Sequence, residues 1–216
     1  MIITKQKPFE EILKMLKDVQ NIYITGCSLC ATTCMTGGEK QILEMKEALE
    51  KEGKEITGFV VLDPSCHKLQ VRATLKKQKE GLEKADAILC MACGDGAQTV
   101  SSIVDEIPVY PANDTLFIGE IERMGHFAEK CRACGECELG WTCGICPMTQ
   151  CAKGLLNGPC GGAKDGKCEV NPENDCAWIL IYERLKKAGK LEQLKQIKPP
   201  KDHSKTLHPM KITVSR

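Results

Sequence analysis

The sequence predicts an α/β fold with an open parallel sheet, followed by an irregular cysteine-rich metal-cluster segment and a C-terminal helix. Short apolar runs alternate with helical patterns from about residue 21 to residue 112. Nine of the fifteen cysteines lie between residues 131 and 176, in a stretch rich in Gly and Pro that has no regular periodicity. Helical periodicity returns directly after Cys176. A chain of 216 residues has room for one large domain or two small ones.

Three strand patterns and three helix patterns fill the first half of the chain. Apolar runs predict strands at 21–26, 56–62 and 86–93, and helical periodicity predicts helices at 36–53, 71–82 and 97–107. Thr36 and Glu39 have the spacing of a capping box. Residues 108–112 and 115–119 are expected to be short extended pieces, and the sixteen N-terminal residues an amphipathic helix. Strands that alternate with helices across short loops predict a parallel sheet of the Rossmann or flavodoxin kind.

The second half of the chain has a different organisation. Residues 120–130 have the pattern of a linking helix, and the helix after Cys176 carries Trp178, Ile181 and Leu185 on one face. From Lys198 the chain is basic and rich in Pro. We therefore expect an α/β domain with one cysteine-ligated cluster (1–120), a cysteine-rich cluster-binding domain with a C-terminal helix (121–197) and an extended tail (198–216).

Composition excludes several classes of partner. Charged residues nearly balance at net +1 and aromatic residues make up 4%, which predicts no nucleic-acid partner and no anionic membrane partner. No run of 18 apolar residues is present, and the N-terminus lacks the apolar region of a signal peptide. We therefore expect a cytoplasmic protein. Thiols stay reduced in the cytosol, so fifteen cysteines indicate metal ligation rather than disulfides.

Five cysteines follow the ends of predicted strands. Cys27, Cys30 and Cys34 come after the first strand, Cys66 after the second, and Cys93 ends the third. The carboxyl ends of parallel strands share one edge of the sheet, so these thiols are expected to converge there. Four thiolates can hold a [4Fe–4S] cluster, which leaves a fifth thiol that the sequence does not identify.

Two local readings compete with this metal site. CSLC, at residues 27–30, also has the spacing of a thioredoxin-like redox dithiol, although the third nearby cysteine and the two distant ones favour metal ligation. Cys90 precedes Cys93 in CMAC, but the two side chains would point to opposite faces of a strand. We therefore interpret Cys90 as a small buried apolar residue.

The second group of cysteines opens with CRACGEC. This C-x2-C-x2-C run resembles the first three cluster ligands of a bacterial ferredoxin, but the Cys-Pro pair that should follow closely lies at Cys146-Pro147 instead. Nine thiols could serve two four-thiolate sites with one to spare, and Cys143 is the expected spare. Zinc also binds four thiolates and is the alternative metal at one site. We find no phosphate loop and no Ser/His/Asp set, so no catalytic residue is expected.

Several segments together resemble a known family. GCSLCATTCMTGGEKQ, DPSC, ACGDGAQTV, GICPMTQCAKGLLNGPCGGAKDGKCEV and CAWILIYERL are similar to the small accessory subunit of acetogen-type methylenetetrahydrofolate reductase, the C-terminal-type family of that reductase. The resemblance covers about residues 20–190, and GLLNGPCGG is its most specific part. It implies cluster or metal ligands at these thirteen positions: Cys27, Cys30, Cys34, Cys66, Cys93, Cys131, Cys134, Cys137, Cys146, Cys151, Cys160, Cys168 and Cys176. Gly usually stands in the family where this chain has Cys143.

The resemblance also implies a role. In that family two to three [4Fe–4S] clusters, sometimes described with zinc, feed electrons to a separate flavin-binding barrel that reduces methylenetetrahydrofolate in the methyl branch of the reductive acetyl-CoA pathway. This chain would then be an electron-transfer subunit that is inactive alone. A further electron-donor complex or a ferredoxin would be its second partner. The alternatives are a zinc-stabilised assembly subunit without a redox role and a thiol-disulfide adaptor.

Overall fold

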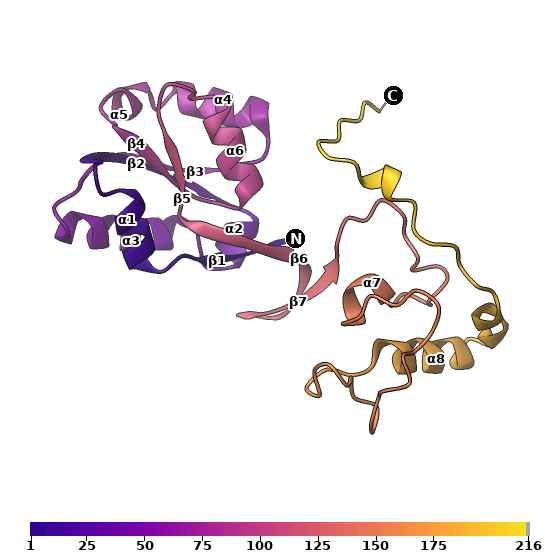
Figure 1. The fold of residues 1–216 in the computed structure, drawn as a ribbon. Helices are drawn as coiled ribbons and strands as arrows, with labels where there is room; N and C mark the ends of the chain where they lie inside the picture. Colours follow the sequence, from indigo (N-terminus) through magenta and orange to yellow (C-terminus); the bar gives the residue numbers. More distant parts are fainter. Residues whose placement is uncertain (215–216) are drawn as a thin grey trace. The chain divides into compact units, whose positions relative to one another are not determined.

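The computed structural model describes residues 1–214 and divides into two compact units, residues 1–128 and the chain from residue 129 onward. The first unit contains a four-stranded sheet of β2 (Asn21–Cys27), β3 (Glu55–Leu62), β4 (Ala87–Met91) and β5 (Val109–Pro111) (Figure 1). Its strand order is β3-β2-β4-β5, and every pair is parallel. This sheet confirms the predicted α/β class. The positions 215–216 of the predicted tail lie outside the described residues.

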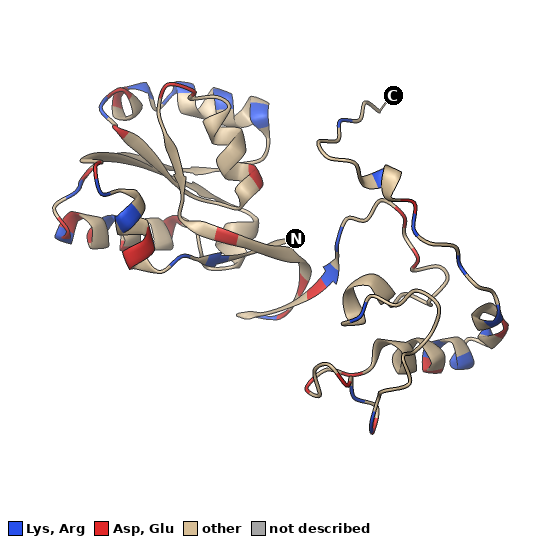
Figure 2. Cartoon of the chain, in the orientation of Figure 1, with Lys and Arg blue, Asp and Glu red and all other residues tan. Residues whose placement is uncertain are grey.

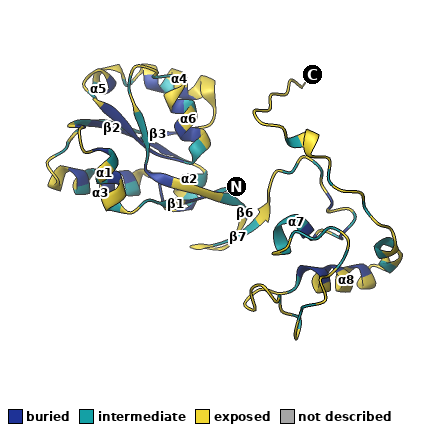
Figure 3. Ribbon diagram, in the orientation of Figure 1, coloured by how far each residue is buried: buried dark blue, intermediate teal, exposed yellow. Residues whose placement is uncertain are grey.

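Helices cover both faces of this sheet (Figure 1). α1 (Phe9–Met15) and α3 (Glu39–Lys51) pack on one face through Ile12, Ile42 and Leu49. α4 (Lys68–Lys76), α5 (Lys79–Glu83) and α6 (Gly94–Ser101) pack on the other through Val71, Leu82 and Val100. The strands between these layers are the most buried part of the unit (Figure 3). Two apolar cores, one on each face of the sheet, therefore stabilise the first unit.

The N-terminal segment and the helix predicted at 71–82 differ from expectation. Residues 1–16 do not form one helix, because β1 (Ile2–Gln6) pairs with a later strand and α1 begins only after Pro8. The sequence over 71–82 forms two helices, α4 and α5, with a break at Lys77 and Gln78. The capping box is also wrong: Gly38 is the N-cap of α3, and the buried Thr36 hydroxyl lies 2.7 Å from that of Thr4.

A second sheet replaces the predicted linking helix at 120–130. Its strand order is β1-β6-β7, with β6 at Asn113–Arg123 and β7 at His126–Cys131. Gly125 adopts φ +79° in the connection between β6 and β7, a conformation that favours glycine. The exposed Glu120, Glu122 and Arg123 therefore lie on a strand rather than on a helix.

The second unit is mostly irregular. Its helices are α7 (Pro147–Gln150) and α8 (Ala177–Lys187), followed by the short 3-10 turns η1 (Leu191–Lys195) and η2 (His203–Thr206). α8 confirms the helix predicted after Cys176, and its buried Trp178, Ile181 and Leu185 join Ile145 in a small core. Lysines recur along the chain after α8 (Figure 2). Over residues 1–214, none of the helices combines the length and the apolarity needed to cross a membrane.

Candidate metal centres

Three of the five predicted thiols of the first unit lie at the carboxyl edge of its sheet. Cys27 ends β2, Cys66 follows β3, and Cys93 is the N-cap residue of α6, two residues after β4 ends. Burial is the main cause of the raised pKa of Cys66, and the nearby charges of Asp95 and Cys93 add to it. Cys27 contributes to the raised pKa of both Cys66 and Cys93, for which burial is again the main cause. Coupling of this kind weakens with distance, so the three thiols share one neighbourhood.

Glycines allow the loops at this edge to approach closely. A Cβ atom on Gly37 would lie 1.7 Å from the carbonyl oxygen of Met91, and one on Gly96 would lie 2.7 Å from Cβ of Ser65. The buried Ser65 hydroxyl donates to the carbonyl of Gly26 (3.0 Å). The segments that carry Cys27, Cys66 and Cys93 are thus closely packed against one another.

The other two predicted thiols are directed elsewhere. Cys30 begins α2 (Cys30–Thr33), and its Sγ accepts a hydrogen bond from the backbone N–H of Ile2 (3.4 Å). Cys34 follows α2, and its buried thiol donates to the carbonyl of Ile2 (3.8 Å). The strand β1, which the sequence did not reveal, therefore occupies both thiols. A single centre that includes all five cysteines stays a prediction.

Cys90 is wholly buried within β4, and burial raises the pKa of its thiol to about 11. Because the thiolate is the reactive form, we expect Cys90 in the folded chain to resist iodoacetamide at pH 8 and to react once the chain is unfolded in urea. The surface thiol of Cys66 is the internal control and should react in both states of metal-free protein. Peptide mass spectrometry reads out both positions, and rapid labelling of Cys90 in the folded chain would contradict its assignment as a core residue.

In the second unit, one small cavity is lined by four thiols. They are Cys151, Cys160, Cys168 and Cys176. Two of them border helices: Cys151 is the C-cap residue of α7, and Cys176 is the N-cap residue of α8. The backbone N–H of Cys168 donates to the carbonyl of Asn174 (2.9 Å), and that of Cys176 donates to the carbonyl of Gly166 (2.7 Å). Backbone hydrogen bonds thus hold the irregular loop so that its cysteines face the same space.

One ion pair borders this cavity. The Cys160 thiol donates to Oε1 of Glu169 (3.2 Å), and the same carboxylate pairs with the ammonium of Lys153. Backbone hydrogen bonds at Asn171 and Val170 lower the pKa of Cys168, which favours the thiolate form that binds metals.

Four further cysteines of the second unit belong to β7, to the loop after it and to the start of α7. Cys131 is the last residue of β7, Cys134 and Cys137 follow it, and Cys146 is the N-cap residue of α7. The Thr149 hydroxyl donates to the carbonyl of Lys130 (3.1 Å), and the Gln150 amide donates to that of Glu129 (2.6 Å). These hydrogen bonds join α7 to the strand β7 that leads into CRACGEC, and Cys146 is the N-cap residue of that helix.

Cys143, the expected spare, has a structural environment of its own. Its backbone adopts φ +52°, where glycine is favoured, and its carbonyl accepts a hydrogen bond from Arg184 of α8 (3.3 Å). The side chain packs against the small core around Trp178. Cys151 and Cys176 pack against the same core, so the assignment of Cys143 as the spare thiol stays a prediction.

The C-terminal tail binds the CRACGEC loop, which sequence reasoning missed. Lys198 pairs with Glu138 (3.2 Å), Lys205 pairs with Glu136 (2.7 Å), and Lys201 contacts both the loop carbonyl at Glu136 and the sulfur of Cys134 (3.4 Å). The sequence signal for this contact was the opposite charge of three tail lysines and of two glutamates, one in the loop and one directly after it.

An aromatic pocket adjoins the four-thiol cavity. The pocket has a volume of about 320 Å³, and its lining includes Trp141, Trp178 and Tyr182. Trp178 and Pro159 line both the pocket and the cavity. Tyr182, with Ile179 and Leu180, is exposed on the outer side of α8. An apolar exposed surface beside a set of thiols is a feature typical of an interaction site.

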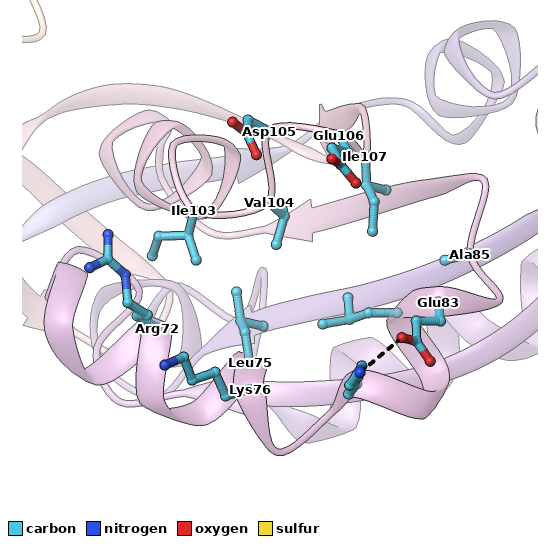
Figure 4. A pocket seen from close by; sticks show the side chains of 12 residues that line it. Arg72, Leu75, Lys76, Glu83, Ala85, Ile103, Val104, Asp105, Glu106 and Ile107 are labelled. Carbon is cyan, nitrogen blue, oxygen red and sulfur yellow. Dashed lines mark ion pairs between the residues drawn. The ribbon is translucent and has the colours of Figure 1, made fainter.

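One groove of the first unit lies away from the thiols (Figure 4). It measures about 660 Å³ and runs between the end of α4 and residues 103–107. Leu75, Val104 and Ile107 point into it, Arg72 and Lys76 lie along one rim, and the Lys79–Glu83 ion pair (3.4 Å) closes one end. No Cys or His lines the groove, so it has no ligands for a soft metal.

All fifteen cysteines are free thiols. Within residues 1–214, no three Cys, His, Asp or Glu side chains stand close enough together to hold a metal ion as they are placed. The fit to a metal therefore rests on donor chemistry: four thiols line one cavity, and thiolates are the ligands that iron–sulfur clusters and structural zinc prefer.

Comparison with known proteins now assigns this part of the chain to a family. The cysteine-rich unit and the strands that lead into it, residues 110–204, match the family described as "Methylene-tetrahydrofolate reductase C terminal". This region of the chain is similar to that family, in agreement with the resemblance seen in the sequence. The protein is thus associated with an oxidoreductase family. A search of curated proteins found no match.

Proposed function

We propose that this chain is the iron–sulfur electron-transfer subunit of a methylenetetrahydrofolate reductase complex and that it delivers electrons to a separate flavin-containing catalytic subunit. The observation that carries the proposal is the four-thiol cavity of Cys151, Cys160, Cys168 and Cys176 within the segment that matches the reductase family. When bound, [4Fe–4S] clusters supply one-electron carriers.

Two four-thiol sets account for the second unit under this proposal. Cys151, Cys160, Cys168 and Cys176 would hold one cluster, and Cys131, Cys134, Cys137 and Cys146 would hold another. Cys27, Cys66 and Cys93, with one further thiol, would hold a third centre in the first unit. Zinc at one of these sites is compatible with the same donors.

The chain's own residues support a carrier rather than a catalyst. The groups at the four-thiol cavity are thiols and one Lys153–Glu169 ion pair, and we assign the folate chemistry to the flavoprotein partner. The exposed Ile179 and Tyr182 of α8 line the aromatic pocket, which shares Trp178 with the four-thiol cavity, and this favours the pocket face for contact with the partner. Electrons could then pass over a short distance between a cluster and the flavin.

The test begins with anaerobic purification of the full chain, followed by measurement of iron, sulfide and zinc. We expect a brown protein whose visible absorbance bleaches with dithionite. The reduced chain should then reduce the flavin of the co-expressed barrel subunit, and the chain alone should have no folate reductase activity.

The same measurements separate the rival roles. Colourless protein with zinc and no iron would support a structural assembly subunit. Equal rates of flavin reduction by the same donor with and without this chain would exclude its role as a carrier.

A further inference from the structure

The tail from Lys198 to Thr206 fits closely against the CRACGEC loop within the second unit. Besides the ion pairs to Glu136 and Glu138, the backbone N–H of Asp202 donates to Oε2 of Glu136 (3.1 Å). A Cβ atom on Gly135, whose φ is +70°, would lie 2.8 Å from the carbonyl oxygen of Lys205. Glycine at this position thus permits backbone-to-backbone approach between loop and tail.

Lys201 is the buried member of the three tail lysines. Its side chain is 8% exposed, compared with 33% for Lys198 and 46% for Lys205. Its ammonium donates to Sγ of Cys134 (3.4 Å) and to the carbonyl of Glu136, and lies 3.7 Å from Oε1 of the equally buried Glu138. A buried ammonium is costly unless its hydrogen-bond partners replace water, and these three partners do so.

We propose that Lys201 is a positioning residue that raises the reduction potential of the metal centre bound through Cys134. The inference rests on the proposed function, because it requires a redox-active cluster at CRACGEC. Reduction adds one electron, and therefore one negative charge, to the centre and its thiolates. A fixed positive charge and an N–H···S hydrogen bond at a ligand sulfur stabilise the reduced state more than the oxidised state.

The other two tail lysines provide matched comparisons. Lys198 pairs with Glu138 and lies 5.6 Å from the centre of the Trp141 ring, and Lys205 pairs with Glu136. Among the contacts of these three lysines, the one to a cysteine sulfur is made by Lys201. A purely structural role for the tail predicts similar effects from Lys201 and Lys205, whereas a role in tuning the centre predicts an effect that is specific to Lys201.

The experiment compares the wild-type full chain with Lys201→Met, Lys201→Arg and Lys205→Met. Each protein is purified anaerobically, its iron and zinc are measured, and the midpoint potentials of its clusters are determined by dithionite titration followed by visible and EPR spectroscopy. In Lys201→Met we expect unchanged iron and a reduction equilibrium about tenfold less favourable for one cluster, equivalent to about 59 mV for one electron. Lys201→Arg should restore most of the shift, and Lys205→Met should show none.

Each outcome of this experiment bears on the role of Lys201 or on the proposed electron-transfer function. Unchanged midpoints in Lys201→Met with normal iron would overturn this inference and leave the proposed function standing. Equal shifts in Lys201→Met and Lys205→Met would also overturn it, because the tail would then act only as a structural brace. Zinc without iron in the wild-type chain would overturn the proposed function and the inference together. Loss of iron from both Lys201→Met and Lys201→Arg would assign Lys201 a structural role instead.

Discussion

Removal of metal is expected to unfold the second unit while the first unit stays folded. The second unit has a core of four buried side chains: Ile145, Trp178, Ile181 and Leu185. The first unit has two larger apolar clusters, one on each face of its sheet. Ordering the backbone costs about 1–2 kcal/mol per residue, and so small a core cannot offset this cost over the irregular stretch from residue 131 to residue 176. Metal–thiolate bonds would supply the difference.

Hydrogen exchange measured by mass spectrometry on the full chain, before and after chelation under reducing conditions, checks this contrast. After chelation, amides of residues 131–176 should exchange nearly as fast as in an unfolded chain. Strand amides of β2 and β4 should keep opening free energies of about 5 kcal/mol or more, the stability of an ordinary small domain. Protection of amides in residues 131–176 that persists after complete metal loss would contradict this prediction. It would show that the second unit folds on its own apolar core and does not need metal–thiolate bonds.

The sequence identified the parallel sheet because its central strands, β2 and β4, are buried on both faces. Ile22, Ile24, Ile88 and Leu89 form continuous apolar runs that differ from the patterns of the flanking helices. The helix α8 could also be predicted, since Trp178, Ile181 and Leu185 recur at helical spacing on one side. In both cases burial selects a pattern of apolar residues that is visible in the sequence: a continuous run in the strands and a helical spacing in α8.

The second sheet could not be predicted in the same way because its strands depend on long-range pairing. β1 is a helix-compatible segment by its charges, and its pairing with β6 joins Ile2 to Ile118 across most of the first unit's sequence. β6 and β7 are largely exposed, so no buried face produced a clear alternation. Gly125 between them was the one local signal of a turn.

The contacts at the candidate sites also differ in how far the sequence could predict them. The positions of Cys27, Cys66 and Cys93 at the carboxyl edge follow from the geometry of any parallel sheet, and their service of one metal centre stays a prediction. The contacts of Cys30 and Cys34 with Ile2 depend on β1 and were missed with it. Lys201 reaches Cys134 from 67 residues away in sequence, and no local pattern reports such a contact.

Serine substitution should divide the nine cysteines of the second unit into two independent sets and a spare. Cys176→Ser is expected to lose about one cluster, roughly four iron atoms per chain, because it removes one of the four thiols that line the cavity. Cys176 is also the N-cap residue of α8, and serine is a favourable N-cap, so the helix itself should persist. Cys143→Ser should retain its iron, since two four-thiol sites use eight of the nine thiols and Cys143 is the expected spare. Its hydrogen bond from Arg184 goes to the backbone carbonyl and should persist. Burial of a hydroxyl there should cost only about 1 kcal/mol of stability.

Pairs of substitutions test the division itself. Cys160→Ser combined with Cys176→Ser should lose no more iron than either change alone, because both thiols belong to the same cavity. Cys137→Ser combined with Cys176→Ser should lose about twice as much, because these thiols are assigned to different centres. Iron and sulfide analysis of anaerobically purified full-length variants gives the answer, with the thermal stability of each variant as the control for folding. If Cys143→Ser loses as much iron as Cys176→Ser, Cys143 is a ligand and both four-thiol sets must be redrawn. If the Cys137 and Cys176 losses do not add, the cysteines of CRACGEC and those of the cavity serve one shared centre.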